Sequence, residues 1–381
     1  MAFQGKVTPE MAEKFKRSRV DEVAPDIWRL EGFSGHPFNI ELSSPNIYIF
    51  REEETVLLTD TGLYPFYRER VLEKLREYLQ KGCEKLILLN THGHFDHVAN
   101  NDLISEAGFP ETEFWLIETE KPVIDLLPHF EADLRDHEKY YNPHNFEPWI
   151  KGGDLYRGLN TMVNQAKIIP LSSRGTKKFG DVELQGWEVK RFFIIHDGAH
   201  TPGHVSFYDP KYKVLATGDL NMEIQPPFLD ASLNRCIEVT DKFRRMADGG
   251  FVEYAMDCHR NSTFYPAIYE KCGVKPLSPA IVTGIARGKR ECYEFFNVWY
   301  TYYTELKEEI FKIHGRLGEA TVPDIVQELR KSTNPWVCMK VTFAYPNRPA
   351  RLGTLVSMVL KEAGAKSRKE GDKILFSTVR R

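Results

Sequence analysis

The chain has 381 residues, 42% hydrophobic and 28% charged, so it can bury a sizeable core and is not expected to be disordered on a large scale. This length suits one large domain with an appendage, or two domains. The net charge of −3 conceals an asymmetry. Residues 312–381 carry 14 Lys and Arg against 6 Asp and Glu, which is +8, so residues 1–311 carry −11. An acidic body with a basic end predicts two modules.

Two features bear on location. Residues 1–21 alternate Lys, Glu and Arg with single apolar residues and lack an apolar core of signal-peptide length, and no later stretch reaches the roughly 18 apolar residues of a membrane span. The six cysteines are scattered without a Cys-x-x-Cys pair, which argues against a disulfide framework and against a thiolate zinc site. We therefore expect a cytoplasmic protein without a membrane partner.

The first part of the chain predicts strands around one helix. Short β-branched or apolar runs, separated by turn residues, indicate the strands. These are residues 27–30, 46–50, 56–59 and 85–89. Apolar residues at helical spacing predict a helix over 67–80, and a second helix is expected over about 98–107.

The middle of the chain is less regular and then returns to strands. Residues 120–165 are rich in Tyr, Pro and His, and we interpret them as an insertion or lid packed on the core. The strands expected after it are 182–184, 187–195, 205–208 and 213–216. Strands, helix and strands again fit a layered α/β sandwich.

The C-terminal part predicts helices. One long helix rich in aromatic residues is expected over 287–314, a second from Pro323 to about 330, and a third over 349–362. The polar turn within 365–376 predicts a β-hairpin. Three helices and a hairpin resemble a winged helix. We therefore expect two domains, which are residues 1–278 with the catalytic site and 279–381 with the helical module.

The chemistry concentrates directly after the strand at 85–89. There, His92, His94, Asp96 and His97 place three imidazoles and one carboxylate within six positions. With 12 His in the chain, three at fixed offsets arise in about one chance in a hundred. Residues two apart on an extended chain project the same way, so His92 and His94 would share a direction. Neutral imidazoles and an ionised carboxylate are costly to bury together without a cation, so a metal site is predicted.

Three further segments carry polar groups just beyond the ends of strands. Residues 196–204, which include His200 and His204, follow one strand, and Thr217-Gly218-Asp219 follows another. The segment 256–260, with Cys258 and His259, has the same character more weakly.

Together these segments resemble the metallo-β-lactamase-fold hydrolases, and within them the glyoxalase II-like branch. The matching motifs occur in the family's order and cover roughly residues 25–265. They are Leu58-Thr59-Asp60-Thr61-Gly62, Thr91-His92-Gly93-His94-Phe95-Asp96-His97, His200-Thr201-Pro202-Gly203-His204, Thr217-Gly218-Asp219 and Cys258-His259. The resemblance implies an αββα sandwich, followed here by a helical, winged-helix-like module.

The resemblance also implies a site for two divalent metal ions. The ligands of the first would be His92, His94 and His200, those of the second Asp96, His97 and His259, and Asp219 would bridge them. All seven donors are nitrogen or oxygen, which suits zinc but also iron or manganese.

Three other residues bear on the implied site, and two of the ligands have a further role. The family usually has Gly-His at the last motif, so Cys258 stays open as a rival to His259. Asp60 and His204 would orient ligands through hydrogen bonds. Asp96 or Asp219 would take or relay the proton of the attacking water.

Substrate contacts must come from the variable parts of the chain. The candidates are His36 and Phe38, in the loop 33–45, and Tyr140 and Tyr141, in the insertion. Together they suggest a partly aromatic, lidded pocket.

The predicted function is that of a hydrolase that uses a hydroxide bridged by two metals on a small ester, either an acyl thioester or a lactone. The basic tail would attract the phosphates of a coenzyme A-type thioester. A phosphodiesterase or ribonuclease is the first alternative, in which the basic C-terminal module binds nucleic acid. An iron-dependent persulfide dioxygenase, or a non-catalytic regulator, is the second. A homodimer is compatible with each of these functions.

Overall fold

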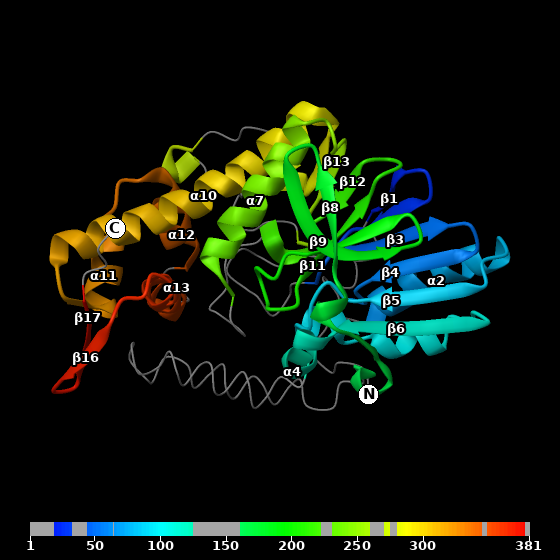
Figure 1. Cartoon of the computed structure of the whole chain (residues 1–381), viewed down its shortest axis with the longest axis horizontal. Coiled ribbons are helices and arrows are strands. Elements are labelled where there is room, and N and C mark those ends of the chain that lie inside the picture. Colours follow the sequence, from blue (N-terminus) through cyan, green and yellow to red (C-terminus); the bar gives the residue numbers. More distant parts are fainter. Residues whose placement is uncertain are drawn as a thin grey trace.

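The structure is a computed structural model that describes residues 19–32, 44–63, 65–124, 161–221, 231–259, 270–274, 280–344 and 349–377. Within these residues, two seven-stranded sheets face each other and helices cover their outer faces (Figure 1). A third sheet, of three strands, belongs to the helical C-terminal part. The predicted αββα sandwich with a C-terminal helical segment is confirmed.

The first sheet contains β1 to β7 in chain order. Its strands are Val20–Ala24 (β1), Ile27–Leu30 (β2), Ile47–Glu52 (β3), Thr55–Thr59 (β4), Lys85–Leu89 (β5), Glu111–Ile117 (β6) and Lys167–Ile169 (β7). Strands β1 to β4 pair antiparallel, whereas β4 to β7 run parallel. Helix α2 (Pro65–Gln80) connects β4 to β5 and packs on the outer face. Because parallel strands end at one edge, the residues after β4 and β5 are neighbours there.

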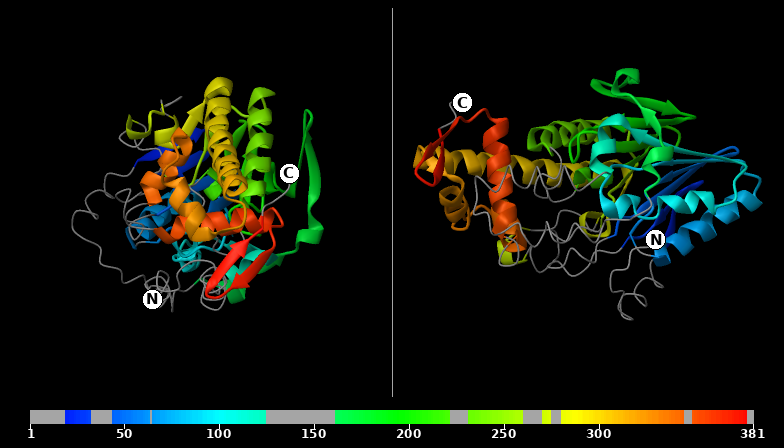
Figure 2. Two further views of the ribbon diagram at one scale, coloured as in Figure 1. Left: turned by 90° about the vertical axis from the view of Figure 1, so that its left-hand side faces the viewer. Right: turned by 90° about the horizontal axis from the view of Figure 1, so that it is seen from below.

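The second sheet is antiparallel except where β12 meets β13. Its strands are Gly175–Phe179 (β8), Val182–Val189 (β9), Phe192–His196 (β10), Val205–Asp209 (β11), Val214–Ala216 (β12), Tyr254–Met256 (β13) and Ile285–Arg287 (β14). Helix α7 (Leu233–Asp248) and helix α10 (Gly288–Leu317) cover its outer face and lie side by side (Figures 1 and 2). Because β12 and β13 are parallel, their carboxyl ends lie at the same edge of the sheet.

Aromatic and aliphatic side chains fill the space between the two sheets. The ring of Phe50 on β3 lies 5.5 Å from that of Phe192 and 6.0 Å from that of Phe207, both on the second sheet. Val56 and Leu58 on β4 instead point to the layer with α2, and Leu57 points between the sheets. This alternation is the period of two that a strand buried on both faces produces.

The C-terminal part continues the core beneath the second sheet. Its further elements are β15 (Ala320–Thr321), α11 (Val322–Leu329), α12 (Pro335–Ala344), α13 (Pro349–Glu362), β16 (Ser367–Glu370) and β17 (Lys373–Phe376). Thr321 and Asp324 cap α11 reciprocally through side chain and backbone. The apolar cluster of α7 and α10 extends without a break to α11 and α13. Helix α10 therefore packs against the sandwich along its first half and against the C-terminal helices along its second.

Short helices occupy several of the connections. They are α3 (Phe95–Val98), η2 (Asn101–Ser105), η3 (Glu118–Glu120), α4 (Lys121–Ile124), η6 (Val163–Gln165), η7 (Leu171–Ser173), η8 (Gly218–Asn221) and α9 (Ala280–Thr283). The predicted helices at 67–80, 287–314 and 349–362, and the predicted hairpin within 365–376, are present as α2, α10, α13 and β16–β17.

Two expectations were wrong. The helix expected over 98–107 is interrupted, because the side-chain amide of Asn100 donates to the carbonyl oxygens of Thr61 and Gly62 and holds the backbone against that loop. The strand expected over 187–195 is two strands, β9 and β10, joined by a tight turn at Lys190, whose φ is 55°. Of the predicted insertion, residues 125–160 lie outside the described residues.

Candidate metal centre

The residues of the predicted site lie after strand ends on both sheets. The segment 90–97 follows β5, 197–204 follows β10, 217–219 follows β12, and 257–259 follows β13. The sandwich brings these four turns together, although residues 90 to 259 span about 170 positions of the sequence. All of their candidate ligands are buried except His94 and Asp96, which are partly exposed.

Three histidines and one carboxylate oxygen form the first group. His94 Nδ1 lies 2.9 Å from His92 Nε2 and 3.2 Å from His200 Nε2. Asp219 Oδ2 lies 3.4 Å from His200 Nε2 and 3.8 Å from His92 Nε2. These four atoms point to a common centre.

The second group uses the other oxygen of the same carboxylate. His259 Nε2 lies 3.3 Å from His97 Nε2 and 3.4 Å from Asp96 Oδ2. Asp219 Oδ1 lies 3.5 Å from both of these imidazole nitrogens. Asp219 thus offers one oxygen to each group and stands between them.

The donor set fits divalent metal ions. Four ligands at about 2.0–2.1 Å from a tetrahedral zinc are roughly 3.3–3.5 Å apart, which is close to the separations in both groups. Asp219 Oδ1 is buried and accepts no hydrogen bond from the part of the chain that the structure describes. Neutral imidazole nitrogens that face one another present lone pairs to the same point, an arrangement that a shared cation stabilises. The residues are therefore compatible with two divalent metals.

The lowered pKa values of the first group keep its ligands in the deprotonated form that binds cations. Burial lowers the pKa of His200 to about 3 and lowers the pKa values of His92 and His94 well below their usual range. For Asp219, burial alone would raise the pKa, but His259 and His97 hold it well below its usual range. The first group is thus deprotonated at neutral pH.

We expect the metal-free protein to lose stability as the pH falls from about 6.5 towards 3. In this window an unfolded chain protonates three histidines that the fold keeps neutral, so acid favours unfolding by about 1.4 kcal/mol per pH unit for each such imidazole. Buried carboxyls oppose this trend, because burial raises the pKa values of Asp96, Glu120 and Asp257 and the fold then binds protons in the same window. Burial lowers the pKa of His97, but Asp219, Asp60 and Asp96 raise it well above the usual range, and the stability that this adds is complete below about pH 6.5 and changes little in this window. Thermal unfolding in chelator at pH 7, 6, 5 and 4 measures the slope.

The matched variant for this measurement is His200→Asn, which should show a shallower loss of melting temperature over the same pH range. A metal-free wild-type protein whose melting temperature is unchanged between pH 7 and pH 4 would contradict the assignment of neutral imidazoles.

Asp60 contacts the turn after β5, which carries His92 and His97. It adopts a left-handed backbone (φ 57°) after β4 and accepts hydrogen bonds from Thr91 N at 2.8 Å and Thr91 Oγ1 at 2.9 Å. Its Oδ2 lies 3.1 Å from His97 Nδ1, and Thr91 Oγ1 lies 3.0 Å from His92 Nδ1. Both rings are thereby held with Nε2 turned towards the metal groups.

His204 supports Asp219 rather than joining either group. Its Nδ1 lies 2.7 Å from Asp197 Oδ1, and its Nε2 accepts the backbone N–H of Asp219 at 2.9 Å. Ser206 Oγ donates to the second oxygen of Asp197 at 2.7 Å. Gly218 must be glycine here, because its φ is +54° and a Cβ would lie 2.5 Å from His204 Nε2.

Glu120 is a buried residue of the site that sequence reasoning missed. One carboxylate oxygen accepts Gly93 N–H at 2.7 Å, and the other accepts Thr201 Oγ1 and Gly203 N–H, both at 2.6 Å. It therefore ties the turn of His94 to the turn of His200. The available signal was the glycine in each of these turns: a Cβ on Gly93 would lie 2.8 Å from Val123, and one on Gly203 2.5 Å from Thr119.

Cys258 lies beside Asp60, with Sγ 3.7 Å from Asp60 Oδ2. Burial raises the pKa of this thiol well above its usual range, which disfavours the thiolate that a metal would need. His259, in contrast, directs Nε2 to Asp96, His97 and Asp219. The geometry favours His259 over Cys258 as the ligand.

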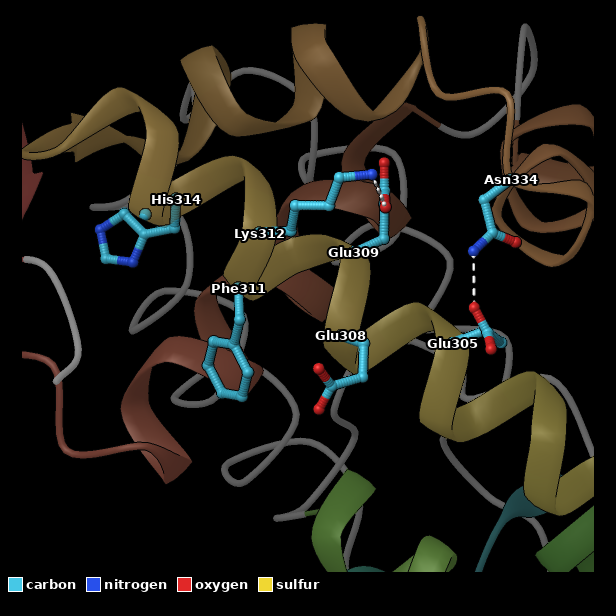
Figure 3. Close-up of a pocket in the computed structure, with 8 residues that line it drawn as sticks. Glu305, Glu308, Glu309, Phe311, Lys312, His314 and Asn334 are labelled. Carbon is cyan, nitrogen blue, oxygen red and sulfur yellow. Dashed lines mark hydrogen bonds and ion pairs between the residues drawn. The ribbon is translucent and has the colours of Figure 1, made fainter. Parts of the chain in front are cut away.

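The predicted substrate residues His36, Phe38, Tyr140 and Tyr141 lie outside the described residues. A cavity of about 710 Å³ is found elsewhere, along the second half of α10 (Figure 3). Its lining residues are Glu305, Glu308, Glu309, Phe311, Lys312, His314, Gly315 and Asn334. None of these belongs to the metal groups, so this cavity is separate from the centre.

Fold and site together define a metal-binding αββα protein. The family model of the metallo-beta-lactamase superfamily matches residues 40–250, and the chain belongs to this superfamily. No curated protein sequence matches it. Among the helices that the structure describes, none has both the length and the apolar character needed to cross a bilayer.

Several solved structures share the fold. A beta-lactamase domain protein from Burkholderia ambifaria has a TM-score of 0.55 at 15% identity, over 94% of this chain and 93% of that one. A metallo-beta-lactamase family protein from Thermus thermophilus has 0.50 at 17%, over 93% and 100%. The sec-alkylsulfatase Pisa1 from Pseudomonas sp. has 0.53 at 12%, over 92% of this chain and 51% of that one, so this chain spans about half its length.

Proposed function

We propose that the protein is a hydrolase of a small ester, an acyl thioester or a lactone, that depends on two zinc ions. The observation that carries this proposal is the position of Asp219 between two groups of three ligands, with Oδ2 towards one and Oδ1 towards the other. Members of the superfamily are mostly metal-dependent hydrolases, in agreement with this.

Each side chain has a definite task in such a reaction. His92, His94 and His200 would hold one metal, Asp96, His97 and His259 the other, and Asp219 both. Two bound metals supply a water of lowered pKa and polarise the oxygen of the scissile group. Asp96 is 13% exposed, and burial raises the pKa of its carboxyl, so it is suited to take up a proton at the open side of the site.

The thioester or lactone class rests on the sequence pattern and on charge. The Thr-His-Gly-His-Phe-Asp-His motif over residues 91–97 resembles the glyoxalase II-like branch. No Ser or Cys nucleophile is required, and Cys258 is held as a buried thiol beside Asp60. The basic C-terminal part would draw in the phosphates of a coenzyme A-type thioester.

A ribonuclease activity is less well supported. The C-terminal order of helices and paired strands agrees with a winged helix. However, at least four basic side chains in the described part of this region form ion pairs with nearby acids. These pairs are Lys312–Glu309, Arg316–Glu328, Lys331–Glu328 and Arg368–Glu319. A long nucleic acid needs many unpaired basic groups along one surface, whereas the phosphates of a coenzyme A-type thioester need only a few, so a small-molecule partner is favoured over nucleic acid.

Removal of the metals should abolish the activity reversibly. Dialysis against a chelator takes away the group that activates water, so we expect hydrolysis to fall to the background rate and to return when zinc is added back. Elemental analysis of the active protein should give about two metals per chain. A value near one iron per chain would instead support the dioxygenase alternative, and full activity in chelator would contradict the proposal.

A substrate panel separates the classes of function. It contains acyl thioesters, lactones, a phosphodiester, RNA, an alkyl sulfate and a persulfide. The alkyl sulfate is included because a sec-alkylsulfatase shares the fold. Turnover of thioesters or lactones supports the proposal, whereas turnover of RNA alone, with affinity that falls steeply with salt, would replace it.

A further inference from the structure

Two cysteines that are distant in sequence meet beneath the C-terminal helices. Cys272 lies in the described segment 270–274, and Cys338 lies on α12, 66 residues later. Their Sγ atoms are 2.7 Å apart, well inside ordinary van der Waals contact of two sulfurs. The other four cysteines, Cys83, Cys236, Cys258 and Cys292, are buried in other parts of the fold.

Cys338 is the more exposed of the two cysteines. Cys272 is 9% exposed and belongs to the apolar cluster under α10, whereas Cys338 is partly exposed and packs at the edge of that cluster. Thr342 Oγ1, one turn further along α12, lies 3.7 Å from Cys272 Sγ and 3.8 Å from Cys338 Sγ. At 2.7 Å the two sulfurs are in direct contact, so a covalent bond is sterically open to them.

We propose that Cys272 and Cys338 form a reversible disulfide that fastens α12 to the segment 270–274. Bonded sulfurs lie about 2.05 Å apart, so bond formation requires a movement of roughly 0.7 Å, within the reach of small side-chain rotations. The proposal does not depend on the metal centre or on the substrate.

The reaction with a small disulfide proceeds by two exchanges. The thiolate of Cys338, the more exposed cysteine, attacks one sulfur of oxidised glutathione, forms a mixed disulfide and releases one glutathione thiol. The Cys272 sulfur then attacks Sγ of Cys338 and releases the second glutathione. The two cysteines lose two protons and two electrons, which reduce the external disulfide to two thiols. Burial raises the pKa of Cys272 to about 11, which suits the order in which Cys338 reacts first.

The bond would connect the two parts of the molecule. Cys272 follows the candidate ligand His259 by 13 residues (272 − 259), and α12 packs against α10 and α13. A cross-link here closes a loop that includes β14, α10 and α11, and it restricts the unfolded chain accordingly. The oxidised protein should therefore resist unfolding more than the reduced protein.

The test uses the full-length protein loaded with zinc, treated at low concentration with either reduced or oxidised glutathione. After denaturation the reduced form should show six thiols and the oxidised form four (6 − 2). A non-reducing digest should contain one cross-linked peptide pair that joins Cys272 to Cys338. The melting temperature should rise by roughly 5 to 10 °C on oxidation and return when a dithiol is added.

Cys338→Ser is the informative variant, because a hydroxyl at this partly exposed position can be hydrated, and Cys83→Ala is the matched control. We expect the first to keep five thiols in both forms (6 − 1) and to show no rise in melting temperature. The second should pass from five thiols (6 − 1) to three (5 − 2) on oxidation and show the same rise in melting temperature as the wild type. Six thiols in the treated wild type, a cross-link between other cysteines, or a cross-link without any rise in melting temperature would each overturn the proposal.

Discussion

Replacement of Asp219 by alanine should remove metals from the protein and eliminate its activity. Asp219 directs one oxygen to His92 and His200 and the other to His97 and His259, so its loss takes a ligand from both groups at once. Loss of a single electrostatic contact to a transition state costs about 10²–10³ in kcat, and we therefore expect a reduction of at least roughly 10³-fold in kcat/KM. Elemental analysis should show fewer metals per chain.

The matched control is Asp181→Ala. Asp181 is an aspartate on the surface, 77% exposed and paired with Arg245, away from the metal groups. This variant should retain the metals and the activity of the wild type. If Asp219→Ala also kept full metal content and activity, the function could not depend on a centre bridged by this residue.

Replacement of Glu120 by glutamine should also have a large effect, in this case on metal affinity. The carboxylate accepts three hydrogen bonds from the turns that carry His94 and His200. An amide can keep the bonds to Thr201 and Gly203, but its NH₂ group would then face Gly93 N–H, donor against donor. We expect metal affinity to fall by about 10 to 100-fold, as is common for residues that support metal ligands. Competition with a chromophoric chelator measures this affinity.

Glu118→Gln provides the comparison, since Glu118 lies on the same short helix η3 but is exposed and accepts a hydrogen bond from Leu171 N–H. Its metal affinity should equal that of the wild type. Saturating zinc should restore much of the activity of Glu120→Gln, because the ligands themselves are present. If excess zinc failed to do so while the fold stayed intact, a positioning role for Glu120 would be contradicted.

Local motifs made much of the site predictable. His92, His94, Asp96 and His97 lie within six positions, so one strand end delivers all four. Asp219 and His200 were also recognisable, since each follows a short apolar strand at a turn that contains glycine. In these cases the residues that determine the geometry are adjacent in sequence.

Glu120 and the pair Cys272 and Cys338 were not predictable in this way. Glu120 follows β6, a strand that begins with Glu-Thr-Glu and so does not read as an apolar run. Its role depends on contacts with two turns, one 27 and the other more than 80 residues away. The two sulfurs meet because α12 packs against α10, and this packing places Cys338 beside the segment 270–274. Long-range packing of this kind leaves no periodic signal.

The second half of α10 has a mechanical consequence. A helix of 30 residues is about 45 Å long. One end of α10 is clamped by α7, with Phe296 against Phe243 at 5.7 Å between ring centroids, and the other by α11 and α13. Because α10 packs against both regions, a displacement of its C-terminal half is passed along the helix to its N-terminal half. Local melting of the C-terminal helices should therefore loosen the packing of α10 and α7 on the sheet that carries His200 and Asp219.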